Sequence, residues 1–190
     1  MPAFDLRGIK VAAYTNTNGT VTYGTPTSAG DAMTAQLELR FAEGRLYAES
    51  KLAEYLRLAT GGTISLGTKY IPDAAKKILY GATDSSRTVD GSSVAGIKYT
   101  ALDVAGYVGC GFFAPDMVDG VEKYTCVFIP KAKFGPPAMN FNTKGENITF
   151  QTPTTTGEFL PDDTTGQLLI ETTVVDTAAE AAAWVAACFA

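Results

Sequence analysis

The chain has 190 residues, 46% of them apolar and 18% charged, a balance typical of a folded domain with a sizeable core. It contains no histidine, so it lacks the commonest general base, the commonest zinc ligand and the usual catalytic triads. The net charge is −5 and the sequence has no basic patch, so we expect any binding of DNA to be weak and non-specific at most.

The cysteines and the hydropathy of the chain indicate the redox state of its thiols and whether it associates with a membrane. The three cysteines, Cys110, Cys126 and Cys188, are widely spaced and odd in number, so they fit neither a metal-binding spacing nor a disulfide framework. We expect three buried, reduced thiols, and Cys110 and Cys126 could face each other across a hairpin. No segment reaches the roughly 20 apolar residues that span a bilayer, and Met1–Asp5 lacks the features of a signal peptide, so we expect no membrane association.

Alternation of polar and apolar residues, interrupted by turn signals, predicts antiparallel strands over most of the chain. Asn18-Gly19 and Asp119-Gly120 are expected to be hairpin turns, whereas the polar segment Asp84–Ala95 is expected to be a surface loop. Gly44 is expected to break the third strand, and Pro153 to mark an edge or a bulge. The predicted strands are Gly8–Tyr14, Val21–Tyr23, Met33–Phe41, Leu46–Ala48, Thr63–Tyr70, Asp103–Pro115, Val121–Phe134, Lys144–Phe159 and Gln167–Val175.

The segment Glu49–Thr60 permits two interpretations. Its apolar residues Leu52, Tyr55, Leu56 and Ala59 recur at helical spacing, and Gly61-Gly62 would end a helix. The alternative, which the resemblance described below implies and which we favour, is a long loop covering residues 43–62 that projects from the sheet. Such a loop is too apolar to remain in water, so it would be ordered only against a partner.

Two helices are expected. Pro72 favours the first position of a helix that Gly81 would end. Thr177 and Glu180 have the spacing of a capping box, which predicts a structural helix over about 177–189. We therefore predict a mainly β fold over residues 1–190: a single-domain β-sandwich or open barrel of antiparallel strands, flanked by one or two short α-helices. The face on which the second helix should pack carries Ala181, Trp184, Val185 and Cys188.

The chemical motifs in the chain are weak. Gly106-x-x-Gly109-x-Gly111 has the spacings of a nucleotide-binding loop in reverse order and no helix after it, so we expect these glycines to admit another segment close to the strand. Asp162-Asp163 and the pair Asp116 and Asp119 could bind a hard cation, but acidic turn residues are common for backbone reasons alone. We therefore assign no catalytic, metal or cofactor residue and expect the protein not to be an enzyme.

Several motifs resemble those of the major tail proteins of long-tailed bacteriophages. The resemblance begins with the series Lys144-Gly145-Glu146, Phe150–Thr154 and Gly157–Phe159, and it includes Leu46-Tyr47-Ala48; the order and spacing of the motifs carry it rather than any one of them. The likeness spans most of the chain but is poorest over about the last 25 residues. Its other segments are Leu6-Arg7-Gly8, Gly61–Gly67, Pro72–Gly81, Gly106–Pro115 and Val127–Phe134.

This resemblance implies a virion protein, assembled in the host bacterial cytoplasm, whose copies form hexameric rings that stack into the tail tube for DNA ejection. Tape-measure, tail terminator and baseplate proteins would be further partners. The candidate subunit-interface residues are Leu46, Tyr47, Leu52, Tyr55, Leu56, Leu58, Phe150, Thr152, Pro153 and Trp184. The alternative from another class is a β-sandwich adhesin or decoration domain that binds a receptor or a glycan.

Overall fold

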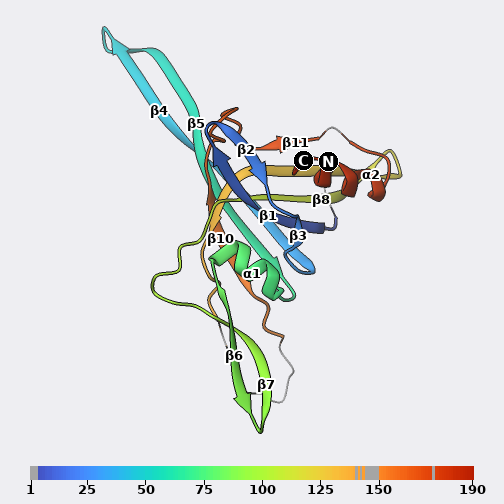
Figure 1. The fold of residues 1–190 in the computed structure, drawn as a ribbon. Helices are drawn as coiled ribbons and strands as arrows, with labels where there is room; N and C mark the ends of the chain where they lie inside the picture. Colours follow the sequence, from blue (N-terminus) through green and yellow to red (C-terminus); the bar gives the residue numbers. More distant parts are fainter. Residues whose placement is uncertain (1–3, 140, 142, 144–149, 173) are drawn as a thin grey trace.

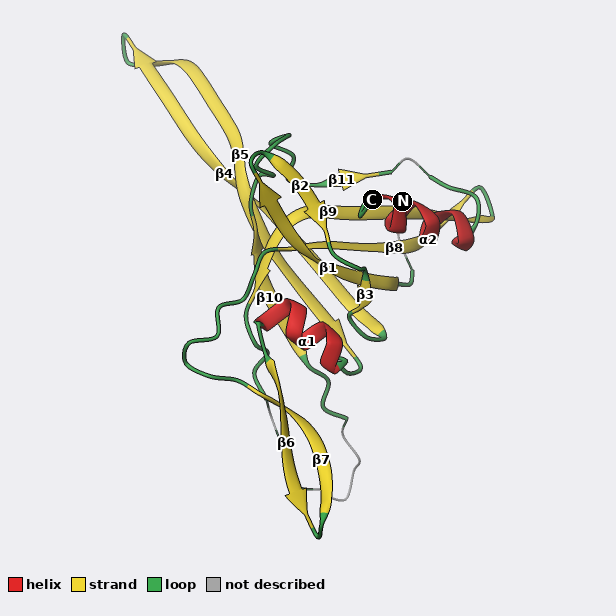
Figure 2. Ribbon diagram, in the orientation of Figure 1, coloured by secondary structure: helices red, strands yellow, loops and turns green. Residues whose placement is uncertain are grey.

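The structure, a computed structural model, describes residues 4–139, 141, 143, 150–172 and 174–190. Strands dominate it, with two short helices packed against them (Figure 2). The elements in chain order are β1 (Arg7–Thr17), β2 (Thr20–Tyr23), β3 (Thr27–Ser28), β4 (Ala32–Ala48), β5 (Lys51–Thr68), α1 (Asp73–Tyr80), β6 (Thr83–Val89), β7 (Ser92–Lys98), β8 (Val108–Val118), β9 (Val121–Phe134), β10 (Thr154–Phe159), β11 (Ile170–Glu171) and α2 (Ala178–Ala187).

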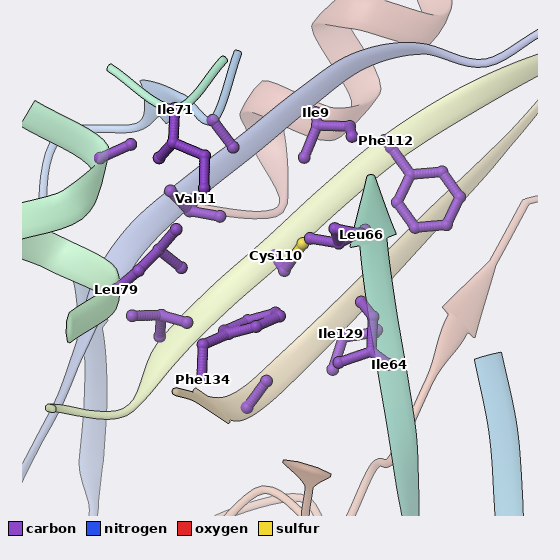
Figure 3. Packing of buried hydrophobic residues seen from close by; sticks show 14 of the residues in the cluster. Ile9, Val11, Ile64, Leu66, Ile71, Leu79, Cys110, Phe112, Ile129 and Phe134 are labelled. Atoms are coloured by element: carbon purple, nitrogen blue, oxygen red, sulfur yellow. The ribbon is translucent and has the colours of Figure 1, made fainter. Parts of the chain in front are cut away.

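Among the described residues, nine strands form one antiparallel sheet, and β6 and β7 form a separate two-stranded sheet. The large sheet has the order β2-β1-β8-β9-β10-β5-β4, with β3 added to β1 and β11 added to β9. The mainly β prediction is therefore confirmed. Strands from both halves of the large sheet share one core, in which Ile9 of β1, Leu66 of β5 and Cys110 of β8 lie together (Figure 3). The sheet consequently curves around this core, and α1 covers it from one side through Ala75 and Leu79.

The two predicted hairpin turns are confirmed. Asn18 and Gly19 both have positive φ, as do Asp119 and Gly120, which is the conformation of a type I′ turn. The strand before Asp119 starts at Val108, later than predicted. Residues 100–103 form a turn instead, because the Asp103 carboxylate accepts hydrogen bonds from the backbone N–H and the hydroxyl of Thr100.

Two regions that were not predicted to be strands form hairpins. Gly44 does not break a strand, because β4 runs through it. Glu49–Thr60 is neither a helix nor a loop, because β4 and β5 pair with each other as far as a turn at Glu49-Ser50. The helical spacing of the apolar residues led to a wrong helix interpretation, because these residues occupy both faces of a bulged strand. Asp84–Ala95 is not a loop either, since it contributes most of β6 and β7. Here Asp90-Gly91 was an overlooked hairpin signal, and both of its residues have positive φ.

Both helices form near the predicted positions. Pro72 is the N-cap rather than the first residue of α1, and Gly81 ends α1 with a φ of 71°. The capping box of α2 is confirmed: Thr177 Oγ1 accepts from the Glu180 N–H, and the Glu180 carboxylate accepts from the Thr177 N–H. On the packing face, Ala181 and Val185 are fully buried, whereas Trp184 and Cys188 are only half-buried.

Small residues on β8 let α2 and its neighbours approach the sheet closely. A Cβ atom at Gly111 would lie 2.8 Å from Val185 Cγ1, and one at Gly109 would lie 2.6 Å from Tyr23 Cε1 and 3.1 Å from Phe189 Cε1. The expectation that the glycines admit another chain segment is confirmed for Gly109 and Gly111 but not for Gly106, where a Cβ atom would have no neighbour within 4 Å. Phe189 packs edge-to-face on Phe128, with 5.0 Å between ring centroids, so α2 belongs to a second core cluster on the opposite face of the sheet.

The C-terminal strands are shorter than predicted. Residues 144–149 of the strand predicted over Lys144–Phe159 lie outside the described residues, and β10 covers only Thr154–Phe159. Pro153 lies just before β10, because proline has no N–H for the ladder. Of the strand predicted over Gln167–Val175, the structure contains β11 and a single bridge between Val175 and Tyr124.

The three cysteines are free thiols. Cys110 and Cys126 do not face each other, since Cys110 is opposite Ile129 and Cys126 is opposite Phe113 in the β8–β9 ladder. They belong to the two different core clusters. Complete burial raises the pKa of Cys110 to about 12, so this thiol stays protonated and unreactive near neutral pH.

Candidate subunit interface

Strands β4 and β5 continue beyond the sheet as a projecting arm, which we define as residues 41–59 (Figure 1). The arm begins at a bulge, where the pairing steps from Arg40 opposite Gly61 to Phe41 opposite Ala59. Neither core cluster contains a residue of this segment. Its large apolar residues are nevertheless numerous, and all are exposed. They are Phe41, Leu46, Tyr47, Leu52, Tyr55, Leu56 and Leu58.

One face of the arm is stabilised by contacts within the arm itself. Side chains of opposed residues in an antiparallel pair lie on the same face, and Phe41, Glu43 and Arg45 are opposite Ala59, Arg57 and Tyr55. The Arg57 guanidinium lies 3.9 Å from the centroid of the Phe41 ring, and its Nε is 3.4 Å from Glu43 Oε1. Arg45 adds a second ion pair to Glu43 and lies 5.5 Å from the Tyr55 ring centroid. These contacts partly cover both rings and hold the arm in register.

The opposite face, which we call the leucine face, lacks such cover. Leu46 is opposite Glu54 and diagonal to Leu56, and Leu58 continues the row toward the body. The residues opposite Leu56 and Leu58 are Gly44 and Ala42, whose small side chains leave the leucines open to solvent. A row of leucines on a projecting element is typical of a protein contact surface.

A hollow with a cavity volume of about 670 Å³ lies beside the far end of β5. Tyr70, Tyr80 and Tyr99 give it aromatic walls, and the ring centroids of Tyr80 and Tyr99 are 6.4 Å apart. Lys69 and Lys76 contribute positive charge. We call this the tyrosine hollow. Its other described lining residues are Ile71, Pro137, Ala138, Met139, Phe141, Gln151, Thr152 and Pro153.

The residues predicted for the interface are thus divided among three places. Those from 46 to 58 lie on the arm, with Leu46, Leu56 and Leu58 on the leucine face and the others on the opposite side. Thr152 and Pro153 line the tyrosine hollow, and Phe150 is exposed nearby in sequence. Trp184 packs partly on the second core cluster. Sequence reasoning missed Tyr70 and Tyr99, because only folding brings these residues together beside α1.

The edges of the large sheet offer a further contact. Strand β4 is terminal in the strand order, so among the described residues one side of its backbone has no ladder partner. It is 17 residues long, whereas β2 at the opposite edge has four. Natural proteins rarely leave so long an edge uncovered, because its N–H and C=O groups favour pairing with another chain. The uncovered β4 edge and the arm are therefore parts of one continuous exposed region.

A polar cluster that the sequence did not reveal fixes the loop after β10. Lys131 of β9 is 8% exposed, makes an ion pair with Asp163, and places its ammonium 4.5 Å from the Tyr107 ring centroid. Tyr14 Oη lies 3.1 Å from a carboxylate oxygen of both Asp162 and Asp163, so it shares one proton between them. Asp162 also accepts from the backbone N–H groups of Thr164 and Thr165.

Hydrogen-bond donors of the protein itself therefore occupy the carboxylates of Asp162 and Asp163, the two residues that the sequence suggested as possible cation ligands. Burial alone would raise the pKa of Asp162, but hydrogen bonds from Thr165 and Tyr14 lower it overall. The hydrogen bond from Lys131 lowers the pKa of Asp163. Within the part of the chain that the structure describes, no group of three acidic or cysteine side chains could hold a metal ion. The geometry supports a structural clasp.

Comparison with known proteins adds no relative: no family model matches the chain, and neither does any curated protein. Neither helix that the structure describes is long and apolar enough to cross a membrane.

Proposed function

We propose that this protein is a structural subunit that assembles with copies of itself, and that the assembly is the tail tube of a long-tailed bacteriophage. The observation that carries the proposal is the arm, which presents leucines to solvent although the rest of the chain buries its core without them. In water such a surface is unfavourable unless another chain covers it.

The sheet edges support the same proposal. A ring requires a heterologous interface, in which one surface of a subunit meets a different surface of the next. The long free edge of β4 and the short edge formed by β2 are two such unlike surfaces, and main-chain hydrogen bonds between edges would join neighbouring sheets into one wall. In the proposed tube, six copies close a ring, and stacked rings enclose the channel through which DNA leaves.

The resemblance of the sequence motifs to major tail proteins supplies the identity of the assembly. On this proposal the curved sheet with α1 and α2 corresponds to the β-sandwich of that family, and the protein resides in the virion tail. A mildly acidic chain also suits the wall of a DNA channel, because like charges let DNA slide rather than stick. Tape-measure, tail terminator and baseplate proteins are the further partners that a tube of this kind would meet.

The test is the oligomeric state of the purified protein. We expect light scattering after size-exclusion chromatography to show growth with concentration, and negative-stain electron microscopy to show sixfold rings or tubes. A protein that stays monomeric at high concentration, with or without divalent cations, would contradict the proposal. It would favour instead an adhesin or decoration domain, whose receptor or glycan a binding screen could then identify.

A further inference from the structure

We propose that the leucine face of the arm docks into the tyrosine hollow of another copy of the chain, so that copies join head to tail. This inference rests on the proposed self-assembly and assigns its two contacting surfaces. The leucine face is Leu46, Leu56 and Leu58, and the acceptor surface is built on Tyr70 and Tyr99.

The placement of the two surfaces supports this partner. Both lie on β5: Lys51 starts the strand beside the arm's turn, and Lys69 and Tyr70 follow its last residue, Thr68. A strand rises about 3.3 Å per residue, so the 18 residues of β5 separate the surfaces by roughly 60 Å at most. Figure 1 shows the arm pointing away from α1, which borders the hollow. The arm of one copy therefore cannot reach the hollow of the same copy. A second copy, translated along the direction of β5, can place its arm at the hollow of the first.

The surfaces also match in chemistry. The leucine face is apolar apart from Glu54, which lies opposite Leu46, and the hollow offers exposed aromatic rings and Met139. At the end of the arm, Glu49, Lys51 and Glu54 contribute two negative charges and one positive charge. The described residues that line the hollow include Lys69 and Lys76 but no carboxylate, although Lys76 Nζ lies 2.8 Å from Asp73 Oδ1 in an ion pair. Lys69 reaches only to 3.7 Å from Asp31 in an exposed pair, so it is available to an incoming acidic residue.

The arm provides a matched control on its other face. Leu56 and Leu58 on the leucine face are 60% and 56% exposed, and Tyr47 and Leu52 on the opposite face are 61% and 54% exposed. Changing either pair to serine removes two apolar residues of similar exposure. Only the change on the leucine face should prevent docking.

The experiment compares four proteins by light scattering and electron microscopy after thermal melts have confirmed folding. The arm variant is Leu56→Ser with Leu58→Ser, the control is Tyr47→Ser with Leu52→Ser, and the hollow variant is Tyr70→Ser with Tyr99→Ser. We expect the wild type and the control to form stacked assemblies. The arm variant and the hollow variant should each need a protein concentration at least tenfold higher before they stack. A control that loses stacking as fully as the arm variant would overturn the assignment to the leucine face.

Mixing the arm and hollow variants distinguishes this contact from its alternatives. A head-to-tail contact leaves one intact junction, between the arm of the hollow variant and the hollow of the arm variant. The mixture should therefore form complexes with a 1:1 ratio of the two variants that do not grow further. If arms instead paired with arms, the hollow variant alone would still assemble, which would overturn the docking site while leaving self-assembly intact. A wild type that never assembles would overturn both the docking contact and the proposed function.

Discussion

At the scale of single residues, the clasp around Asp163 explains how a loop without regular structure is held against the sheet. Lys131 is buried on β9, and its charge is balanced by Asp163 and by the faces of two tyrosine rings. Asn16 donates a further hydrogen bond to Asp163, and Thr164 donates one to the Gly19 carbonyl. The loop after β10 is thereby tied to the β1–β2 hairpin.

The clasp should make stability depend on pH in the acid range. The pKa values of Asp162 and Asp163 are lowered in the folded state, so each binds a proton more weakly there than in the unfolded chain. Their contribution is present above the unfolded value of about 3.9 and is lost as the pH falls through the lower folded values. We expect wild-type melting temperatures to hold between pH 7 and 5 and to drop below about pH 4.

The variant Asp163→Asn isolates this contribution. It should melt below the wild type at pH 7, and the difference should shrink as the pH approaches 3. Asp119→Asn, in the β8–β9 turn, is the control and should follow the wild-type pH profile. An Asp163→Asn profile parallel to that of the wild type would show that the clasp carries no pH-dependent stability.

At the scale of elements, local chemistry predicted turns and caps well. Asn18-Gly19, Asp119-Gly120, Gly81 and the Thr177–Glu180 capping box all depend on one or two residues, and each is found where expected. The arm was not predictable in the same way. Its strands carry apolar residues on both faces and a bulge at residue 60, so neither the period of a strand nor that of a helix is clean.

The candidate interface was predictable only in part, for a related reason. Exposed leucines and tyrosines between residues 46 and 58 stand out in the sequence because they occur in a segment rich in charges. The hollow draws on four separate segments: the residues just after β5, α1, the residue after β7 and the chain between β9 and β10. The clasp likewise joins Tyr14, Lys131 and Asp163 across more than 100 residues. No local pattern encodes such long-range groupings.

Helix α2 should stabilise the fold mainly through residues other than its tryptophan. Trp184 was expected to be a core residue but is half-buried, whereas Phe189 is 5% exposed and contacts the rings of Tyr23 and Phe128. Phe189→Ala should therefore lower the free energy of unfolding by about 3–5 kcal/mol, and Trp184→Ala by less. Urea denaturation of both variants measures the two values. A larger loss for Trp184→Ala would contradict this order.

At the scale of the whole molecule, we expect the chain to divide into a body that folds on its own and an arm that folding does not require. The body contains both core clusters, the two helices and the clasp. The arm contributes ion pairs and ring contacts that are all exposed, and such contacts are worth little individually. On the proposed function, the arm acts in the assembly rather than in the monomer.

Removing the arm tests this division directly. Phe41 and Ala59 are opposite each other, so deleting Ala42–Leu58 and joining the two residues through Asn-Gly should close a shorter hairpin. Because no core residue is lost, we expect a cooperative melt within about 2 °C of the wild-type monomer. The shortened protein should also remain monomeric at concentrations at which the full chain assembles, as measured by light scattering. A truncated chain that melts without cooperativity would place the arm in the folding core, and one that stacks as the full chain does would remove the arm from the interface.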